Sequence, residues 1–388
     1  MITAWHLAFK EIWRNRGRFL LFALVIALIA LLVLFIAALG EGLGSGNREY
    51  LEKVDADLIV YQAVARLSIG ASRVDLDTRR AIRALEGVNA VAPVGFGSAA
   101  VPEPGGSEFL DVALIGVEPG MPGEPPVVAG EGFIRDNVNE AIIDRTVALV
   151  TGLGAGDDLV VRTVKGNEDE FYTVRIVGVS SSQKYGLRPS VFLPKRTWDK
   201  IRPDPMVMGA NGLVQPMYNV LFVSLADPSQ AEVVTDRIKS RLDRVEVVDP
   251  RTAYENTPGY REQQSTLATQ NAFALLIGVL VIGGFFQIQT LQKVPQIGML
   301  KAIGTPNGII GAAALLQIVI TNLVGIALGA LVAYVVSLVF PPNIPIVFEP
   351  QSSAIALASI LLMGPLGGLV SVRYSLRIEP LTALGLGK

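Results

Sequence analysis

The stretch FLLFALVIALIALLVLFIAAL, residues 19–39, decides the fold because it contains no polar side chain. A helix needs about 20 consecutive apolar residues to cross a bilayer. Three further apolar stretches follow, at residues 271–291, 308–340 and 352–372. The first stretch is longer than the apolar core of a signal peptide, and no clean small-residue cleavage site follows it. The sequence therefore predicts four transmembrane helices.

The composition excludes several kinds of site. The chain has 388 residues, of which 51% are hydrophobic and only 18% charged, whereas soluble domains carry about a quarter charged residues. It contains no cysteine and one histidine, which excludes disulfides, thiolate metal sites and multi-histidine metal sites. We expect no metal, no cofactor and no nucleic-acid partner.

Charge predicts the orientation of the helices. The flank at residues 1–18, the segment at 292–307 and the tail at 373–388 together hold nine basic residues against two acids, a net charge of +7. Residues 40–269 hold 24 basic and 32 acidic residues, and the short loop at 341–351 has one acid and no base. Short basic loops stay in the cytoplasm. We therefore expect both termini to be cytoplasmic in a bacterial inner membrane, with residues 40–270 outside.

The N-terminal flank predicts a helix lying on the membrane surface. Tryptophans and basic side chains recur there near helical spacing, which suits a contact with lipid headgroups over residues 1–18. The expected membrane-interface residues are Trp5, Trp13, Arg14, Arg16 and Arg18. A plain basic flank with two interfacial tryptophans is the simpler alternative.

Residues 40–270 predict an α+β domain inserted between the first and second transmembrane helices. A strand at 57–61, a helix at 78–86 capped by Asp77 and a strand at 88–94 are followed much later by a second strand–helix–strand unit at 220–248. Short β-branched runs between them predict an inserted β subdomain at about 95–215. Polar, helical joining segments would form a stalk.

No catalytic motif is present in this domain. We find neither a G-x-S-x-G elbow nor an H-E-x-x-H pair. Lys184 beside residues 180–182, all serines, suggests a Ser/Lys dyad, but the spacing matches no known motif. A membrane-anchored enzyme is therefore a remote alternative, and we predict no catalytic residue.

The segment between the second and third transmembrane helices, residues 292–307, is longer and more apolar than a connector needs. We expect a short helix at 297–303 ended by Gly304, with Thr305 capping the next helix and Pro306 at its first position. Small-residue pairs in the later helices permit close packing, within one subunit or across a dimer. These pairs are Gly325/Gly329 and Gly364/Gly368.

This segment resembles the coupling segment R-E-I-G-x-x-K/R-A-I/L-G of ABC permeases of the MacB (macrolide-exporter), FtsX and lipoprotein-releasing class. Pro295 and Gln296 stand where the family has Arg-Glu. In length and ectodomain the chain is similar to the DevC-type glycolipid-export permeases. The resemblance implies that an ATPase contacts Ile297, Gly298, Met299, Lys301, Ala302, Ile303 and Gly304.

The resemblance also implies partners and a function. No G-x-x-x-x-G-K-[ST] motif is present, so ATP would be bound by a separate ABC ATPase subunit. Family members work as homodimers or heterodimers of permeases, some with a periplasmic adaptor. The expected function is export of a lipid, lipoprotein, peptide or drug-like substrate, driven by motion passed to the outer domain. The alternative is an FtsX-like transmitter that activates an outer hydrolase without transport.

Overall fold

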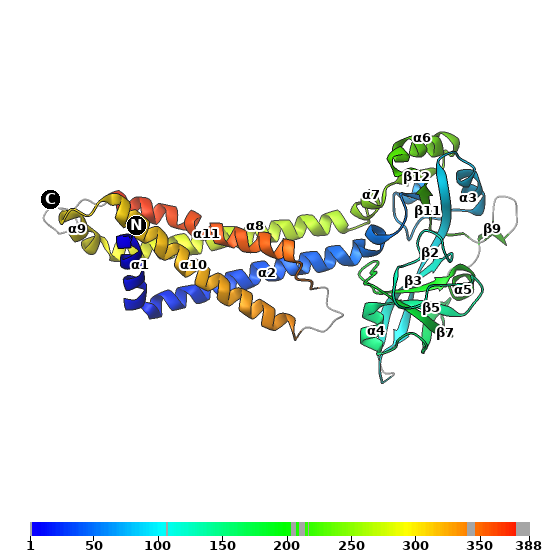
Figure 1. The fold of residues 1–388 in the computed structure, drawn as a ribbon, viewed down its shortest axis with the longest axis horizontal. Helices are drawn as coiled ribbons and strands as arrows, with labels where there is room; N and C mark the ends of the chain where they lie inside the picture. Colours follow the sequence, from blue (N-terminus) through cyan, green and yellow to red (C-terminus); the bar gives the residue numbers. More distant parts are fainter. Residues whose placement is uncertain are drawn as a thin grey trace. The chain divides into compact units, whose positions relative to one another are not determined.

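The computed structural model describes residues 2–105, 108–202, 207–208, 214–215, 217–339 and 346–377. Within them the chain divides into two compact units, one helical and one rich in β-strands (Figure 1). The helical unit comprises the described residues up to 42 and those from 264 onward, and the sheet unit comprises the described residues from 43 to 263. Parts of the predicted outer loop (341–345) and cytoplasmic tail (378–388) lie outside the described residues.

Four helices are long and apolar enough to cross a membrane. They are α2 (Arg16–Lys53), α8 (Tyr260–Gln292), α10 (Asn307–Ser337) and α11 (Pro350–Arg377). Each contains one of the four apolar stretches, although the predicted third span, 308–340, runs past the end of α10. The two short helices of this unit are α1 (Ile2–Arg14) and α9 (Val294–Ala302).

Glycines bring the long helices into close contact. A Cβ on Gly325 of α10 would lie 2.6 Å from the Ile26 Cβ of α2, and one on Gly364 of α11 would lie 2.6 Å from the Asn322 amide nitrogen of α10. Real Cβ atoms do not approach this closely, so only glycine permits the observed packing. Both small-residue pairs singled out in the sequence, Gly325/Gly329 and Gly364/Gly368, face another helix of the same subunit.

The sheet unit is built mainly from one ten-stranded sheet. Its strand order is β12-β1-β11-β2-β3-β8-β5-β7-β4, and β6 pairs with β2 and β7. The main strands are β1 (Leu58–Gln62), β2 (Val88–Pro102), β3 (Phe109–Val117), β4 (Val127–Gly130), β5 (Glu140–Asp144), β6 (Asp158–Lys165), β7 (Glu168–Ser180), β8 (Ser190–Pro194), β11 (Val220–Leu225) and β12 (Val245–Val248). The helices are α3 (Leu76–Arg83), α4 (Arg145–Thr151), α5 (Lys195–Ile201), α6 (Ala231–Arg241) and α7 (Pro250–Glu255), with short 3-10 turns η1 (Ala63–Ala65) and η2 (Pro228–Gln230). A separate pair, β9 (Val207–Met208) and β10 (Val214–Gln215), completes the unit.

The two strand–helix–strand units of the sequence pair with each other. The strands β12, β1, β11 and β2 lie side by side, each antiparallel to its neighbour, which is the split βαβ arrangement of ferredoxin-like folds. The helices α3 and α6 supply Ile82 and Ile238 to the core beneath these strands. The strand–helix–strand unit near the start of this domain therefore pairs with the one near its end.

Two details differ from the sequence-based expectations. The N-cap of α3 is Asp75, whose side chain accepts a hydrogen bond from the Thr78 N–H at 2.8 Å, whereas Asp77 lies inside the first turn. The predicted start of a β subdomain near residue 95 falls inside β2, which pairs with β11 through its first half and with β3 through its second. The inserted strands therefore continue the same sheet.

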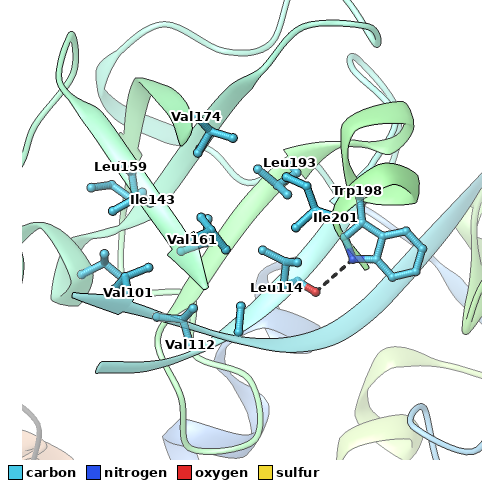
Figure 2. Packing of buried hydrophobic residues seen from close by; sticks show 14 of the residues in the cluster. Val101, Val112, Leu114, Ile143, Leu159, Val161, Val174, Leu193, Trp198 and Ile201 are labelled. Atoms are coloured by element: carbon cyan, nitrogen blue, oxygen red, sulfur yellow. Dashed lines mark hydrogen bonds between the residues drawn. The ribbon is translucent and has the colours of Figure 1, made fainter. Parts of the chain in front are cut away.

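Trp198 anchors α5 on this continued sheet (Figure 2). Its ring lies over Gly95 of β2 and Gly116 of β3, which are cross-strand partners. A Cβ at either glycine would come within 2.5 Å of the indole ring. The indole Nε1 donates a hydrogen bond to the Leu114 carbonyl oxygen at 3.3 Å. The two glycines thus create the space that the buried indole fills.

Candidate functional site

Helix α9 has one buried and one exposed side, and the exposed side carries apolar side chains as well as Gln296. Ile297 and Gly298 are buried against the helical unit, while Met299 and Ile303 keep 55% and 74% of their surface exposed. Ala302 is exposed as well. Exposed apolar side chains in a group indicate a contact surface for another molecule. We call Met299, Ala302 and Ile303 the exposed apolar face of α9.

The end of α9 is fixed by a glycine in the left-handed region. Gly304 has a φ of +89°, and its N–H donates to the Lys301 carbonyl oxygen at 3.0 Å. The N–H of Thr305 donates to the Leu300 carbonyl oxygen, also at 3.0 Å. These two bonds form a Schellman motif, which satisfies carbonyls that a helix end otherwise leaves unpaired. Pro306, rather than the predicted Thr305, is the N-cap of α10, and it makes no side-chain capping bond.

Polar contacts attach α9 to three other helices. At its start, the Lys293 Nζ lies 2.5 Å from the Glu11 Oε1 of α1 and donates to the Gln317 Oε1 of α10 at 3.2 Å. The Gln317 Nε2 in turn donates to the other Glu11 oxygen at 2.5 Å. Burial lowers the pKa of Lys293, an effect that the nearby Glu11 carboxylate opposes. Near the end of α9, the Lys301 Nζ donates to the Leu376 carbonyl oxygen of α11 at 2.8 Å.

The second feature is the attachment of the last turns of α2 to the sheet unit. Tyr50 of α2 is fully buried in the core of this unit, where its ring packs against Phe192 and Phe222. Its hydroxyl donates to the Gly123 carbonyl oxygen at 2.8 Å. The end of this candidate membrane span is therefore part of the core of the sheet unit.

Residues 181–188, which we call the anchor loop, bind the same end of α2. The Lys53 Nζ donates to the Ser182 carbonyl oxygen at 2.7 Å, and the Ser182 hydroxyl donates to the Glu49 carboxylate at 2.7 Å. The backbone N–H of Leu187 donates to the Gly46 carbonyl oxygen at 3.0 Å. These three hydrogen bonds connect both ends of the anchor loop to α2.

Leu187 lies against Gly46 in a strained conformation. Its φ is +65°, a region that costs a residue with a Cβ about 1–2 kcal/mol. A Cβ on Gly46 would come within 2.9 Å of the Leu187 Cδ2 and 3.3 Å of its Cα. The glycine allows the loop backbone to approach α2, and the tertiary contacts hold Leu187 in the unfavourable region.

The anchor loop is also bound to the sheet. The N–H of Gln183 donates to the Asp144 Oδ2 at 2.5 Å, and Asp144 ends β5. Burial raises the pKa of Asp144, while the N–H groups of Gln183 and Thr146 partly offset this effect. The hydroxyl of Ser190, at the start of β8, donates to the Gln183 carbonyl oxygen at 2.5 Å. The loop therefore links α2 to two strands.

Two family descriptions match the chain, and together they cover most of it. The MacB-like periplasmic core domain matches residues 19–241, and the FtsX-like permease C-terminal domain matches residues 271–380. The chain is an ABC-transporter permease of the MacB/FtsX class. Permeases of this class are the non-catalytic subunits of their complexes, so an ATPase partner and a bacterial membrane follow from membership.

Full-length relatives agree with this assignment. A Staphylococcus haemolyticus protein named hemin transport system permease protein HrtB is 24% identical over 98% of this chain and 99% of its own length. An uncharacterized ABC transporter permease of Mycobacterium tuberculosis is 25% identical over 96% and 97%. The crystal structure of the periplasmic region of MacB from Actinobacillus actinomycetemcomitans aligns with 53% of this chain and 94% of its own, at 12% identity and a TM-score of 0.36.

The residues predicted to contact the ATPase divide into two groups in the permease. Met299, Ala302 and Ile303 are exposed on α9, whereas Ile297 and Gly298 are buried in the permease itself. Lys301 binds α11 through its ammonium group, and Gly304 ends the helix. Only the first group has side chains available to a partner, and the second positions the helix.

The predicted membrane-interface residues lie on two helices rather than one. Trp5, Trp13 and Arg14 are exposed on α1, but the helix breaks after Arg14, and Arg16 and Arg18 lie in the first turn of α2. The Arg18 guanidinium donates to the Gln292 side chain at the end of α8, at 2.5 Å. The expected continuous interfacial helix over residues 1–18 is therefore too long.

Sequence reasoning missed the polar groups that hold these helices. In the sequence, Glu11 and Lys293 contribute only to the charge count that predicts orientation. Gln317 lies within the predicted apolar stretch 308–340 and does not stand out as a contact residue. An acid within a strongly basic flank was the available signal for Glu11. Ser182 and Lys184, considered as a catalytic pair, instead bind α2 through the Ser182 hydroxyl and the Lys184 carbonyl oxygen. A metal site is not found in the described part of the chain either, because it contains no group of three or more His, Cys, Asp and Glu side chains that could hold a metal ion.

Proposed function

We propose that the permease receives ATP-driven motion at α9 and passes it to an extracytoplasmic sheet unit that moves substrate outward. In this proposal α9 and both termini face the cytoplasm of a bacterium, and the permease works as a homodimer or heterodimer with two ATPase subunits. A periplasmic adaptor would complete some such complexes. The positive net charge of the segments beside α9 supports this orientation.

The exposed apolar face of α9 is the observation that carries the proposal. A helix of nine residues that buries only Ile297 and Gly298 gains little from packing on its own subunit. Its exposed Met299 and Ile303 would be desolvated by a cleft on an ATPase. The Schellman end at Gly304 and the polar contacts of Lys293 and Lys301 hold that face in a fixed position.

The continuity of α2 supports the second half of the proposal. This helix runs without interruption from Arg16 to Lys53, and its last turns are bound to the anchor loop and to the core around Tyr50. A displacement of α2 along or about its axis therefore has a direct mechanical connection to β5 and β8. Substrate would be handled at the outer surface, since the apolar stretches of the four spans contain no Asp, Glu, Lys or Arg.

Hemin is the first substrate to test within the wider class of amphipathic compounds. The support is that two full-length relatives, at 23–24% identity, are named hemin transport permeases. Lipids, lipoproteins, peptides and drug-like molecules remain in the same class of export substrates.

The test uses the permease purified with the ATPase that accompanies it from membranes. The variants Ala302→Arg and Ile303→Glu should insert into the membrane normally but lose at least tenfold in hemin-stimulated ATPase activity, because a charge replaces apolar contact area. His6→Arg, an exposed change on α1, serves as the control and should keep full activity. Unchanged activity in both α9 variants would overturn the coupling role.

Orientation and the alternative function are tested in intact cells. The chain has no cysteine, so single cysteines at Ala302 and Val164 can be labelled with an impermeant maleimide without background. Labelling of Val164→Cys alone from outside intact cells supports the proposed orientation, and the reverse result contradicts it. Activation of an outer hydrolase without export of any substrate would favour the FtsX-like transmitter.

A further inference from the structure

A groove of about 370 Å³ lies in the helical unit where α1, the start of α2 and α10 meet. Ile12 and Trp13 of α1 form one side, Arg16 and Leu20 of α2 form another, and Val324 of α10 closes it. It is separate from the exposed apolar face of α9, whose residues do not line it.

The break between α1 and α2 creates this groove. Asn15 interrupts the helix, and its carbonyl oxygen accepts hydrogen bonds from the N–H groups of Arg18 and Phe19 at 3.0 and 3.3 Å. The next residue but one, Gly17, lines the groove, and a Cβ placed there would meet no atom within 4 Å. A side chain at position 17 would therefore have room to extend beside the groove and narrow it.

The walls suit a hydrocarbon chain. Apart from Arg16 and Thr321, the lining side chains are apolar, and the Thr321 hydroxyl is already bonded to the Gln317 carbonyl oxygen at 2.7 Å. An apolar cavity of about 150 Å³ is enough to bind benzene, and ligand pockets start at about 300 Å³. The groove thus has room for a substantial part of an acyl chain.

The charges at the groove select an anionic headgroup. Within the described part of the chain, neither the Arg14 nor the Arg16 side chain makes a hydrogen bond or an ion pair. The nearby acid, Glu11, is neutralised by Lys293 and bonded to Gln317. Arg16 lines the groove, and Arg14 is next in sequence to the lining residue Trp13. Basic side chains without acidic partners at an apolar groove are complementary to a phosphate joined to a hydrocarbon chain.

We propose that this groove is a binding site for one anionic phospholipid, with an acyl chain between α1, α2 and α10 and the phosphate on Arg16. Trp13 lies at headgroup depth in this arrangement, where tryptophan is favoured. A bound lipid would fill the gap at the helix break and hold α1 against α10. The site is independent of the ATPase contact and of the transported substrate.

A second copy of the permease is a poorer occupant. If the groove met the same groove of a two-fold related copy, the arginines of one copy would face those of the other. Like charges in an interface disfavour association. A lipid phosphate neutralises the same arginines.

The experiment measures lipid retained by the full-length permease in native mass spectrometry. The purified protein is stripped of lipid by detergent and then offered phosphatidylglycerol or phosphatidylcholine of the same chain length. Wild type should retain one phosphatidylglycerol in preference to phosphatidylcholine. Gly17→Leu should abolish this retention by filling the groove. Arg16→Gln should lower the preference about fivefold while leaving chain binding, as expected for the loss of one basic residue near the headgroup.

Gly308→Leu is the matched control. Gly308 is also the second residue of a helix, a Cβ there would also meet no atom, and it does not line the groove. It should retain lipid as wild type does, and both leucine variants should keep wild-type helix content by circular dichroism. Equal retention of the two lipids by wild type, unchanged retention in Gly17→Leu, or equal loss in both leucine variants would overturn the proposal. Loss of the dimer in Gly17→Leu without loss of lipid would assign the groove to subunit contact instead.

Discussion

Helix α9 and the anchor loop are both short segments beside a long helix, but they use opposite kinds of contact. The anchor loop is bound on both sides by its own chain, through backbone bonds to α2 and to the β5 and β8 strands. Helix α9 is held at its two ends by Lys293 and Lys301, and between them it exposes Met299 and Ile303. The loop is bound by hydrogen bonds to its own chain, whereas α9 exposes apolar side chains to its surroundings.

Under the proposed function, the difference separates the segment that would receive a partner from the segment that would transmit displacement. A segment that must release and accept another subunit is fixed at its ends and left uncovered between them. A segment that must transmit displacement within one chain is bound at short intervals, as residues 181–188 are. Substitutions in each segment should therefore have different consequences.

Gly46→Leu should have the largest effect, because it forces the anchor loop away from α2. The new side chain would overlap Leu187, and overpacking of this kind costs about 1–3 kcal/mol of folding free energy. We expect a lower melting temperature of the sheet unit and loss of hemin-driven transport, with the basal ATPase activity of the complex retained. Thermal unfolding and transport assays in vesicles measure the two effects.

Gly40→Leu provides the matched control on the same helix, since a Cβ there makes only an ordinary contact with Leu267 at 3.5 Å. Leu187→Gly should partly rescue Gly46→Leu, because it removes the overlapping side chain and relieves the positive φ. Equal effects of the substitutions at positions 40 and 46 would show that the anchor loop has no special role.

Glu11→Gln should have an intermediate effect at the other segment. It removes the charge partner of Lys293 and leaves that ammonium group half-buried, which costs about 1–3 kcal/mol. We expect faster hydrogen exchange in the first turn of α9 and weaker coupling of ATPase activity to substrate. Lys10→Gln, an exposed neighbour, is the control, and unchanged exchange in Glu11→Gln would contradict a role for this ion pair.

Gly304→Ala should have the smallest effect. Alanine at a φ of +89° costs about 1 kcal/mol, so the end of α9 should fray and ATPase coupling should fall several-fold. Gly304→Asn should be milder, because asparagine tolerates the left-handed region. Gly308→Ala should raise the free energy of unfolding instead of lowering it, because alanine is favoured over glycine within a helix. Hydrogen exchange at Ile303 and thermal unfolding distinguish these outcomes.

The membrane helices and the outline of the sheet unit follow from the sequence because they depend on local patterns. Uninterrupted apolar runs such as 19–39 and β-branched runs such as 220–225 report burial directly. The split βαβ unit could be inferred from the repeated order of strand and helix at residues 57–94 and 220–248. Its continuation into the inserted strands could not, because pairings such as that of Ala113 in β3 with Ser190 in β8 join distant residues and leave no local signal.

The site was predictable only in part, for a similar reason. The position of α9 and its end at Gly304 follow from local chemistry and from the family motif. Which of its residues face outward depends on packing against α10 and α11, so Ile297 and Gly298 were assigned to a partner although they are buried. The contacts of Glu11 with Lys293 join residues 282 positions apart in the sequence, and that of Ser182 with Glu49 joins residues 133 apart.

The indole of Trp198 has a consequence for how this protein can change over time. Its ring occupies space that exists only because positions 95 and 116 carry no side chain. Replacing either glycine with a larger residue would clash with the indole while Trp198 is present. Replacing Trp198 with a smaller residue would leave a cavity unless one of the glycines were also replaced by a larger residue. Three positions on three different elements are therefore expected to be exchanged together or retained together among descendants.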